Sequence, residues 1–360
     1  MKQFFLRLTL FLSPVLTLLA LNALVIPVDA IYFRCWEAFT PKIFFDFYHG
    51  PFYSGMTAEK VEPGDLAPHT SLAVRTRVVW KTDNYGYRTA GTDKTYSTVI
   101  IGDSNTVGSH MTQDDTLAVV LEKRIGRPVY PFAPAVPSDF LVERRFNKHL
   151  TRTVILAMIE RGLPGLKAPP LPEFQAALRF RHKLSARIKD RLSTNPAIDY
   201  IVNLVDRSFD PALVLKYFPQ KITGKLPPPV YGYKAGEWLF LQGVAANAVR
   251  PAAELQDAVD SIDVYNRIFQ EIGIRMIFVP IPNKENIYYR MLPGGRKPTF
   301  LTDLITQVRN KGVTTVDLET PFRAAYENDH LTLYHTDDSH WGPLAVQVAA
   351  RAIADSLAAN

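Results

Sequence analysis

The feature that most constrains this chain is a short apolar run that ends in a polar turn at Gly102–Asn105. The run, Val99–Ile101, is β-branched and predicts a buried strand, and a helix-like segment at 112–123 follows the turn. Ser104 therefore lies where the carboxyl edge of a sheet meets the start of a helix. A serine in such a turn is most often a turn residue or a helix cap, so a catalytic role requires a partner elsewhere.

Similar apolar segments recur along the chain and alternate with segments of helical periodicity. We expect strands at 77–80, 127–132, 153–159, 237–241, 274–281 and 313–318, and helices at 138–150, 252–272, 301–310 and 342–357. Strands that alternate with helices indicate βα units and a parallel sheet. The sequence therefore predicts an α/β fold.

The N-terminus is strongly apolar. Residues 8–28 are almost free of polar side chains and follow Lys2 and Arg7. About 20 apolar residues suffice for a helix to span a bilayer, and positive charge before them keeps the N-terminus inside. We expect a membrane anchor within residues 1–30, in the inner membrane, with the body in the periplasm. A cleaved signal peptide is the alternative, since the small residues at 28–30 suit cleavage.

The remaining chain divides into two parts. An aromatic-rich linker is expected at 31–76, and a catalytic domain at 77–360 with a proline-flanked insertion at about 165–235. Basic side chains in the insertion indicate either a solvated helix face or contact with an anionic surface. The net charge of +6 comes without a base-reading motif, so we expect no nucleic-acid partner. Cys35 is the one cysteine, so no disulfide forms within the chain.

A polar turn near the C-terminus supplies the partner that Ser104 needs. Nucleophilic catalysis by serine requires a base and a group that orients the base. His340 is the natural base, and Asp338 can orient it, with Asp337 as the other candidate. Asp and His could also bind a metal, yet one His and two Asp in one turn are thin evidence for zinc. We therefore expect no metal and no cofactor.

These motifs resemble those of the SGNH/GDSL hydrolase superfamily, in particular its alginate O-acetyltransferase branch. The resemblance covers residues 80–360 with a gap at 165–230. The matching motifs are Gly102-Asp103-Ser104-Asn105, Glu160-Arg161, Gly236-Glu237-Trp238-Leu239-Phe240, Pro280-Ile281-Pro282-Asn283-Lys284 with Tyr288, and Asp338-Ser339-His340-Trp341.

The resemblance implies a three-layer α/β/α sheet and a triad in which Ser104 is the nucleophile, His340 the base and Asp338 its orienting acid. Asn105, Arg161 and Lys284 are candidates for oxyanion or substrate binding. For Arg161 the alternative is a structural pair with Glu160, and for Lys284 it is a surface lysine.

Three departures limit what the resemblance carries over. The glycine and the asparagine that complete the oxyanion hole in the superfamily have no counterparts at 131–135 and 160–161. In the alginate enzymes the Asp-His block precedes the serine, whereas here Ser104 comes first. The alginate substrate is therefore not transferred.

The resemblance and the expected export together predict a membrane-anchored O-acetyltransferase that acts on an exported or cell-envelope polysaccharide. The polysaccharide would be the acceptor, and a multi-spanning membrane acyltransferase the acyl donor. A carbohydrate esterase of the same fold is one alternative. A non-catalytic glycan-binding or assembly subunit is the other, and the incomplete oxyanion motifs favour it.

Overall fold

The computed structural model describes residues 2–24, 34–42, 48–89, 96–143, 151–169, 195–208, 223–224, 228–243 and 250–359. Most of the predicted insertion, parts of the aromatic linker and the end of the apolar N-terminal run lie outside these residues.

The central sheet is parallel and has four strands in the order β4-β3-β5-β8. Ser104 directly follows β3, which lies between β4 and β5. The register pairs Gly102 with Ala157, and Met158 of β5 with Pro280 of β8. The residues that follow β3, β5 and β8 therefore meet at one edge of the sheet. The strands span Thr98–Gly102 (β3), Val129–Phe132 (β4), Thr153–Ile159 (β5) and Arg275–Ile281 (β8).

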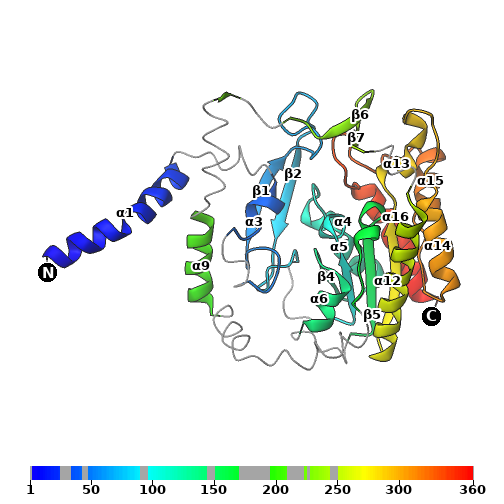
Figure 1. Cartoon of the computed structure of the whole chain (residues 1–360), viewed down its shortest axis with the longest axis horizontal. Coiled ribbons are helices and arrows are strands. Elements are labelled where there is room, and N and C mark those ends of the chain that lie inside the picture. Colours follow the sequence, from blue (N-terminus) through cyan, green and yellow to red (C-terminus); the bar gives the residue numbers. More distant parts are fainter. Residues whose placement is uncertain are drawn as a thin grey trace.

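Alternate strand residues bury their side chains on opposite faces of this sheet. Ile100 and Ile155 pack into one core, whereas Val99 and Val154 pack into the other. Such two-sided burial explains why the strands are continuous apolar runs. The first core is covered by α5 (Leu117–Ile125), α15 (Glu319–Glu327) and α16 (Pro343–Ala358), and the second by α6 (Pro137–Val142), α12 (Ala252–Glu271) and α14 (Phe300–Asn310). The fold is thus a three-layer α/β/α arrangement (Figure 1).

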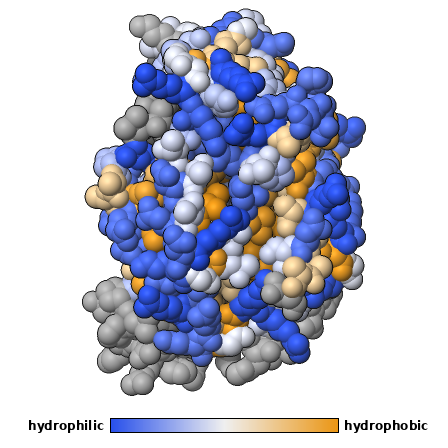
Figure 2. All heavy atoms as spheres, turned by 90° about the vertical axis from the view of Figure 1, so that its right-hand side faces the viewer, coloured by the Kyte–Doolittle hydropathy of each residue, from blue (hydrophilic) through white to orange (hydrophobic). Residues whose placement is uncertain are grey.

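The outer helices present mainly hydrophilic side chains to solvent. Figure 2 shows the face on which α12 and α14–α16 lie, with hydrophobic residues mostly between hydrophilic ridges. Ile272 and Leu344 are exceptions, with 41% and 44% of their surface exposed. This pattern is what amphipathic helices produce when the apolar side faces a core.

Two expected strands differ in the structure. The segment at 237–241 forms β7 (Trp238–Leu241), which pairs antiparallel with β6 (Tyr231–Ala235) outside the parallel sheet. Its two-residue turn contains Gly236 at a positive φ of 60°, which suits a tight hairpin. The segment at 313–318 contacts β8 through a single parallel bridge between Phe278 and Thr315. It is not a regular strand.

The segment expected as a linker packs against the catalytic domain. It contains α3 (Cys35–Phe39) and β1 (Thr57–Glu62), which pairs antiparallel with β2 (Thr76–Lys81). Cys35, Phe52 and Trp80 are buried in one apolar cluster that also includes Val107, just after the Ser104 turn. The N-terminal part of the chain therefore supports the site directly.

The N-terminal helix α1 (Lys2–Leu24) extends away from the body (Figure 1). Its apolar side chains are exposed, Phe11 by 79% and Leu10 by 64%. Within the described residues, no helix combines the length and the apolarity that crossing a bilayer requires.

The remaining short elements lie in loops around the sheet. They are α4 (Ser104–Val107), α13 (Lys284–Ile287) and the 3-10 turns η2 (Gln113–Asp115), η3 (Glu160–Gly165) and η4 (Tyr289–Met291). The longer helix α9 (Pro196–Ser208) lies away from the central sheet (Figure 1).

Candidate active site

Ser104 is held at the start of the one-turn helix α4 by contacts of its two neighbours. The Asp103 carboxylate accepts hydrogen bonds from Asn105 N at 2.9 Å and from Ile159 N at 2.6 Å. Gly102 lies so close to β5 that an added Cβ would come within 2.0 Å of the Ala157 carbonyl oxygen. The sequence Gly-Asp-Ser-Asn therefore fits the turn tightly against the neighbouring strand.

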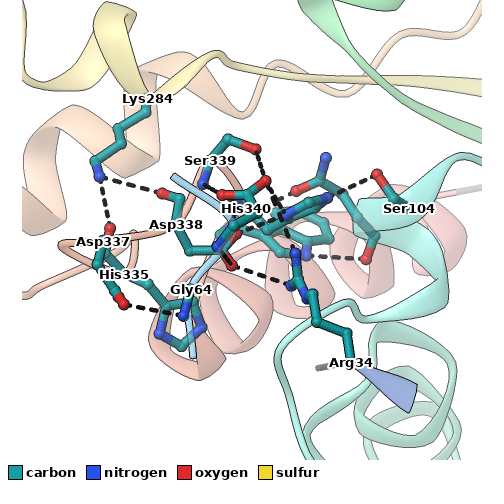
Figure 3. Close-up of polar contacts among 12 residues, drawn as sticks. Arg34, Gly64, Ser104, Lys284, His335, Asp337, Asp338, Ser339 and His340 are labelled. Carbon is teal, nitrogen blue, oxygen red and sulfur yellow. Dashed lines mark hydrogen bonds and ion pairs between the residues drawn. The ribbon is translucent and has the colours of Figure 1, made fainter. Parts of the chain in front are cut away.

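The loop before α16 brings an imidazole to this serine. His340 Nε2 lies 2.8 Å from Ser104 Oγ, and His340 Nδ1 lies 2.6 Å from Asp338 Oδ1 (Figure 3). Asp338 Oδ1 also accepts the His340 backbone N–H at 2.9 Å. A carboxylate on Nδ1 leaves Nε2 free to accept the serine proton. The three residues have the contacts of a Ser-His-Asp triad.

Asp338 is fully buried and ionised. Its other oxygen, Oδ2, accepts a hydrogen bond from Asp65 N at 2.9 Å and pairs with the Arg34 guanidinium at 3.0 Å. Burial alone raises the pKa of Asp338, but the charges of Arg34 and His340 outweigh it and hold that pKa well below its usual value. The carboxylate is therefore available to orient His340 across the whole working pH range.

Asp337 has a different role from Asp338. Its Oδ2 accepts backbone hydrogen bonds from Gly64 N at 2.9 Å and from Val74 N at 2.6 Å. These contacts fasten the loop at 63–74 to the loop that carries His340. The geometry places Asp338 on the imidazole and Asp337 on the backbone of that neighbouring loop.

Lys284 lies inside the protein, although the sequence placed it among residues that could contact substrate. Only 2% of its surface is exposed, and its ammonium donates to the carbonyls of Leu239, His335, Thr336 and Asp338 at 2.6–3.1 Å. Burial lowers the pKa of Lys284 to about 8. The sequence indicated a surface position because it could not show that four carbonyls converge on this ammonium.

Arg88 makes an equivalent set of contacts on the serine side. It is fully buried, lies over the Trp80 ring, and donates to the carbonyls of Val107, Gly108, Val79 and Met111. Burial lowers the pKa of Arg88 to about 9. Val107 ends α4, and Gly108 and Met111 belong to the loop that follows it, so Arg88 fixes the segment behind Ser104.

Asn105 and Trp341 connect the serine turn with the histidine loop. Asn105 Oδ1 accepts from Trp341 N at 3.2 Å, and the Asn105 carbonyl accepts from Trp341 Nε1 at 3.0 Å. Both side chains are fully buried. Trp341 thus holds the two loops together. Asn105 Nδ2 has no hydrogen-bond partner among the described residues, so one donor beside the serine is unused.

Arg161 is the partly exposed cation of the site. Its Nη2 lies 3.4 Å from Ser339 Oγ, and its backbone N–H donates to Asn283 Oδ1 at 3.2 Å. Asn283 N in turn donates to Glu160 at 3.1 Å, and burial raises the pKa of that carboxyl to about 8. Glu160 therefore supports the backbone of this edge, while the Arg161 guanidinium reaches toward the histidine loop.

Two further histidines lie behind the triad. His110 and His335 stack edge to face at 4.6 Å, and burial lowers the pKa of His110 to about 3 and that of His335 to about 4. His110 adopts a left-handed backbone conformation, with φ of 60°. At neutral pH both rings are uncharged. The charges around Asp338 therefore come from Arg34 and the neighbouring carboxylates.

One cluster among the described residues has the spacing of a metal site, and it consists of Asp65, Asp338 and His340. Arg34 already pairs with both carboxylates, at 3.8 Å and 3.0 Å. A metal cation would have to share these oxygens with a buried guanidinium. The donor set therefore fits an ion pair with Arg34 better than a metal.

Sequence reasoning missed Arg34 and Asp65. Both come from the segment expected as a linker, yet both contact Asp338, and Asp65 also accepts from Ser339 N at 2.7 Å. Only the short Pro63-Gly64-Asp65 turn pointed to a tight loop there. Gly64 is required because an added Cβ would come within 2.3 Å of the Asp337 carbonyl oxygen.

A known protein family matches the C-terminal part of the chain. Residues 235–360 match the model of a family described as the SGNH hydrolase-like domain of acetyltransferase AlgX. The match contains Asp338 and His340, and Ser104 lies before it.

A solved acetyl xylan esterase, Est2A from the rumen bacterium Butyrivibrio proteoclasticus, is 11% identical to this chain, with 81% of this chain and 74% of that one covered and a TM-score of 0.33. No curated protein matches the chain.

The strand β8 and the Asp-Ser-His-Trp loop lie within the family match, and the Ser104 turn that His340 contacts lies before it. Over residues 235–360 the chain is similar to the SGNH hydrolase-like acetyltransferase domain, and this match supports an O-acyltransferase or ester hydrolase.

Proposed function

We propose that the protein is an O-acetyltransferase that modifies an exported or cell-envelope polysaccharide through an acyl-enzyme on Ser104. The observation that carries this proposal is the 2.8 Å contact between Ser104 Oγ and His340 Nε2, with Asp338 on the other ring nitrogen. The match at 235–360 supports acetyl transfer as the reaction.

In the first half-reaction, Ser104 Oγ attacks the carbonyl carbon of an acetyl ester while His340 Nε2 takes the hydroxyl proton. Asp338 stabilises the imidazolium that forms. Collapse of the tetrahedral intermediate breaks the bond to the leaving alcohol, and His340 returns the proton to that oxygen. The Ser104 backbone N–H and Asn105 Nδ2 are the donors we propose for the oxyanion.

In the second half-reaction, a sugar hydroxyl gives its proton to His340 and attacks the acetyl-serine, which restores Ser104 and leaves an acetylated sugar. Water in place of the sugar would make the protein an esterase. Exclusion of water from the acyl-enzyme favours transfer. Arg161, partly exposed beside Ser339, is the residue we propose to contact an acceptor that carries acidic groups.

We further propose that the apolar segment at 8–28 attaches the protein to the inner membrane with the body in the periplasm. The apolar composition of this segment, the preceding Lys2 and Arg7, and the exposed apolar side chains of α1 support this placement. A multi-spanning acyltransferase in the same membrane would then supply the acetyl group. Replacing Leu12 and Leu16 by Arg should release the protein from membranes that are washed with carbonate, and retention would contradict the attachment.

Turnover of p-nitrophenyl acetate tests the acyl-enzyme chemistry. Wild-type protein should release p-nitrophenol, and Ser104→Ala should abolish release while the thermal unfolding midpoint stays near that of wild type. Ser109→Ala is the matched control, because that serine lies on the same loop without contacting His340. A wild-type protein with no turnover and no labelling by a fluorophosphonate would instead favour the non-catalytic glycan-binding alternative.

The acceptor is tested in the same assay. Oligosaccharides from the cell envelope are added with the acetyl donor, and acetyl groups are counted on sugar and as free acetate. Transfer predicts that acetyl-sugar increases at the expense of acetate as oligosaccharide is added. Acetate alone at every oligosaccharide concentration would identify an esterase.

A further inference from the structure

The back of the triad is closed by a cation from outside the central fold. Arg34 lies just before α3, and 5% of its surface is exposed. Its guanidinium lies 3.0 Å from Asp338 Oδ2, on the side of the carboxylate opposite His340, and 3.8 Å from Asp65 Oδ2 (Figure 3).

The Arg34 guanidinium is buried and charged, so it must be paired with a carboxylate. Burial alone lowers the pKa of Arg34, but Asp338, Asp65, Glu62 and Glu37 together raise it, so the guanidinium is charged at every working pH. A charged group this deeply buried is stable only when it is paired, and Asp338 is the nearest carboxylate. The ion pair therefore fixes the positions of both groups.

We propose that Arg34 is a positioning residue of the active site, whose guanidinium holds the Asp338 carboxylate in place and sets the pH range over which His340 acts as a base. The proposal rests on the proposed function only in taking His340 as that base. It also makes the segment beside the N-terminal apolar run a part of the catalytic apparatus.

Charges of both signs surround Asp338 and His340. Arg34 opposes a positive charge on the imidazole, whereas Asp65, whose Oδ2 lies 3.5 Å from His340 Nδ1, favours one. The other titratable or charged groups around this pair are His110, Lys284, His335 and Asp337. Because Arg34 and Asp65 carry opposite charges, removing each in turn should shift the titration of His340 in opposite directions.

The test compares Arg34→Gln and Asp65→Asn in the full-length protein. The pH at which kcat/KM for p-nitrophenyl acetate falls to half on the acid side should rise by about one unit in Arg34→Gln and fall in Asp65→Asn. KM should change little, because neither side chain contacts the ester. Arg34→Lys, which keeps the charge but loses the planar fork, should keep the wild-type pH profile with a lower kcat.

Two controls separate positioning from loss of structure. Arg77→Gln removes an exposed guanidinium that pairs with Glu59 at 2.6 Å, and it should leave the pH profile unchanged. If Arg34→Gln alone does not fold, the double variant Arg34→Gln/Asp65→Asn keeps the net charge of the cluster. Its half-activity pH should then lie above that of Asp65→Asn.

The titration of the His340 imidazole is followed in parallel by NMR of carbon-labelled histidine, assigned with His340→Gln, so a protein without turnover still gives the result. Absence of turnover in wild type would count against the proposed function alone. An unchanged imidazole titration in Arg34→Gln, or shifts of the same sign in Arg34→Gln and Asp65→Asn, would overturn the role of Arg34.

Discussion

At the scale of single residues, three buried cations hold the segments that carry the triad. Arg88 binds carbonyls behind Ser104, Lys284 binds carbonyls of the loop before His340, and Arg34 pairs with Asp338. Buried charges are costly unless hydrogen bonds or ion pairs compensate for lost hydration. Four carbonyls around Lys284 and four around Arg88 supply that compensation. The cations therefore connect loops that the central sheet does not hold.

The two neighbouring aspartates should respond differently to the same substitution. Asp338→Asn removes the charge that stabilises the imidazolium and favours the wrong tautomer, so kcat should fall by about 10³–10⁴-fold. Asp337→Asn weakens the contacts to Gly64 N and Val74 N, so it should lower stability while kcat stays within about threefold of wild type. Steady-state kinetics and urea unfolding of both variants check this, and equal losses of kcat would contradict the assignment.

His335 should make stability fall as the pH falls. Its folded pKa of about 4 lies below the ordinary 6.5, so the unfolded chain binds the extra proton first. The contribution is complete above about pH 6.5 and is lost between there and about pH 4, up to about 3 kcal/mol. In His335→Phe, the free energy of unfolding should decline less over this range than in wild type, as measured by urea unfolding at several pH values.

His69 provides the comparison for that experiment, because it is only partly buried. His69→Phe should keep most of the wild-type pH dependence. If His335→Phe and His69→Phe change the slope equally, burial of the His335 ring is not the cause.

At the scale of elements, the close approach of β3 and β5 determines where Ser104 lies. Gly102→Ala would place a methyl group 2.0 Å from the Ala157 carbonyl oxygen and 2.2 Å from Thr106 Oγ1. Backbone must move to relieve this contact, so we expect a loss of about 1–3 kcal/mol in stability and a larger relative loss in kcat. Thermal unfolding and p-nitrophenyl acetate kinetics measure both effects.

Gly165→Ala is the matched control, because an added Cβ there meets no atom within 4 Å. It should leave stability and kcat close to wild type. A Gly102→Ala protein that behaves like Gly165→Ala would show that the strand spacing is not limiting.

The sequence predicted the strands that are buried on both faces and the helices that have one regular apolar face. The strands β3, β5 and β8 are continuous apolar runs because both faces of the sheet are covered, and the helices α12, α14 and α16 follow helical periodicity. The strand at 237–241 was expected to continue the alternation of strands and helices, because a single apolar strand does not reveal its partner, and its pairing with β6 was not predicted. The segment at 313–318 was predicted as a strand because it is apolar. In the structure it lies beside β8 but pairs with it at a single bridge.

In the site, residues that stand in short motifs could be predicted from the sequence, and residues brought in by tertiary packing could not. Ser104, His340 and Asp338 stand in short motifs with recognisable neighbours, so their association could be proposed from the sequence. Arg34 and Asp65 reach Asp338 through tertiary packing of a segment that has no such motif. Lys284 shows the opposite case, because its charge suggested solvent whereas its ammonium binds buried carbonyls.

At the scale of the whole molecule, the N-terminal segment and the catalytic domain share a core and should unfold together. Cys35 is the one cysteine, it is fully buried, and it lies in the cluster that includes Trp80 and Val107. Its reaction with a thiol reagent in increasing urea should therefore have the same midpoint as the loss of far-UV circular dichroism. Labelling at low urea while activity persists would show that the segment opens independently.

The central chemical event of the proposed mechanism is the transfer of an acetyl group to Ser104. Its most direct test is peptide mass spectrometry of protein that is mixed with p-nitrophenyl acetate and quenched in acid within the first turnovers. We predict one acetyl group on the peptide that contains Ser104, absent in Ser104→Ala and accumulating in any variant whose deacylation is slowed. Turnover without an acetylated Ser104 peptide, or the same acetylation in Ser104→Ala, would contradict the acyl-enzyme mechanism.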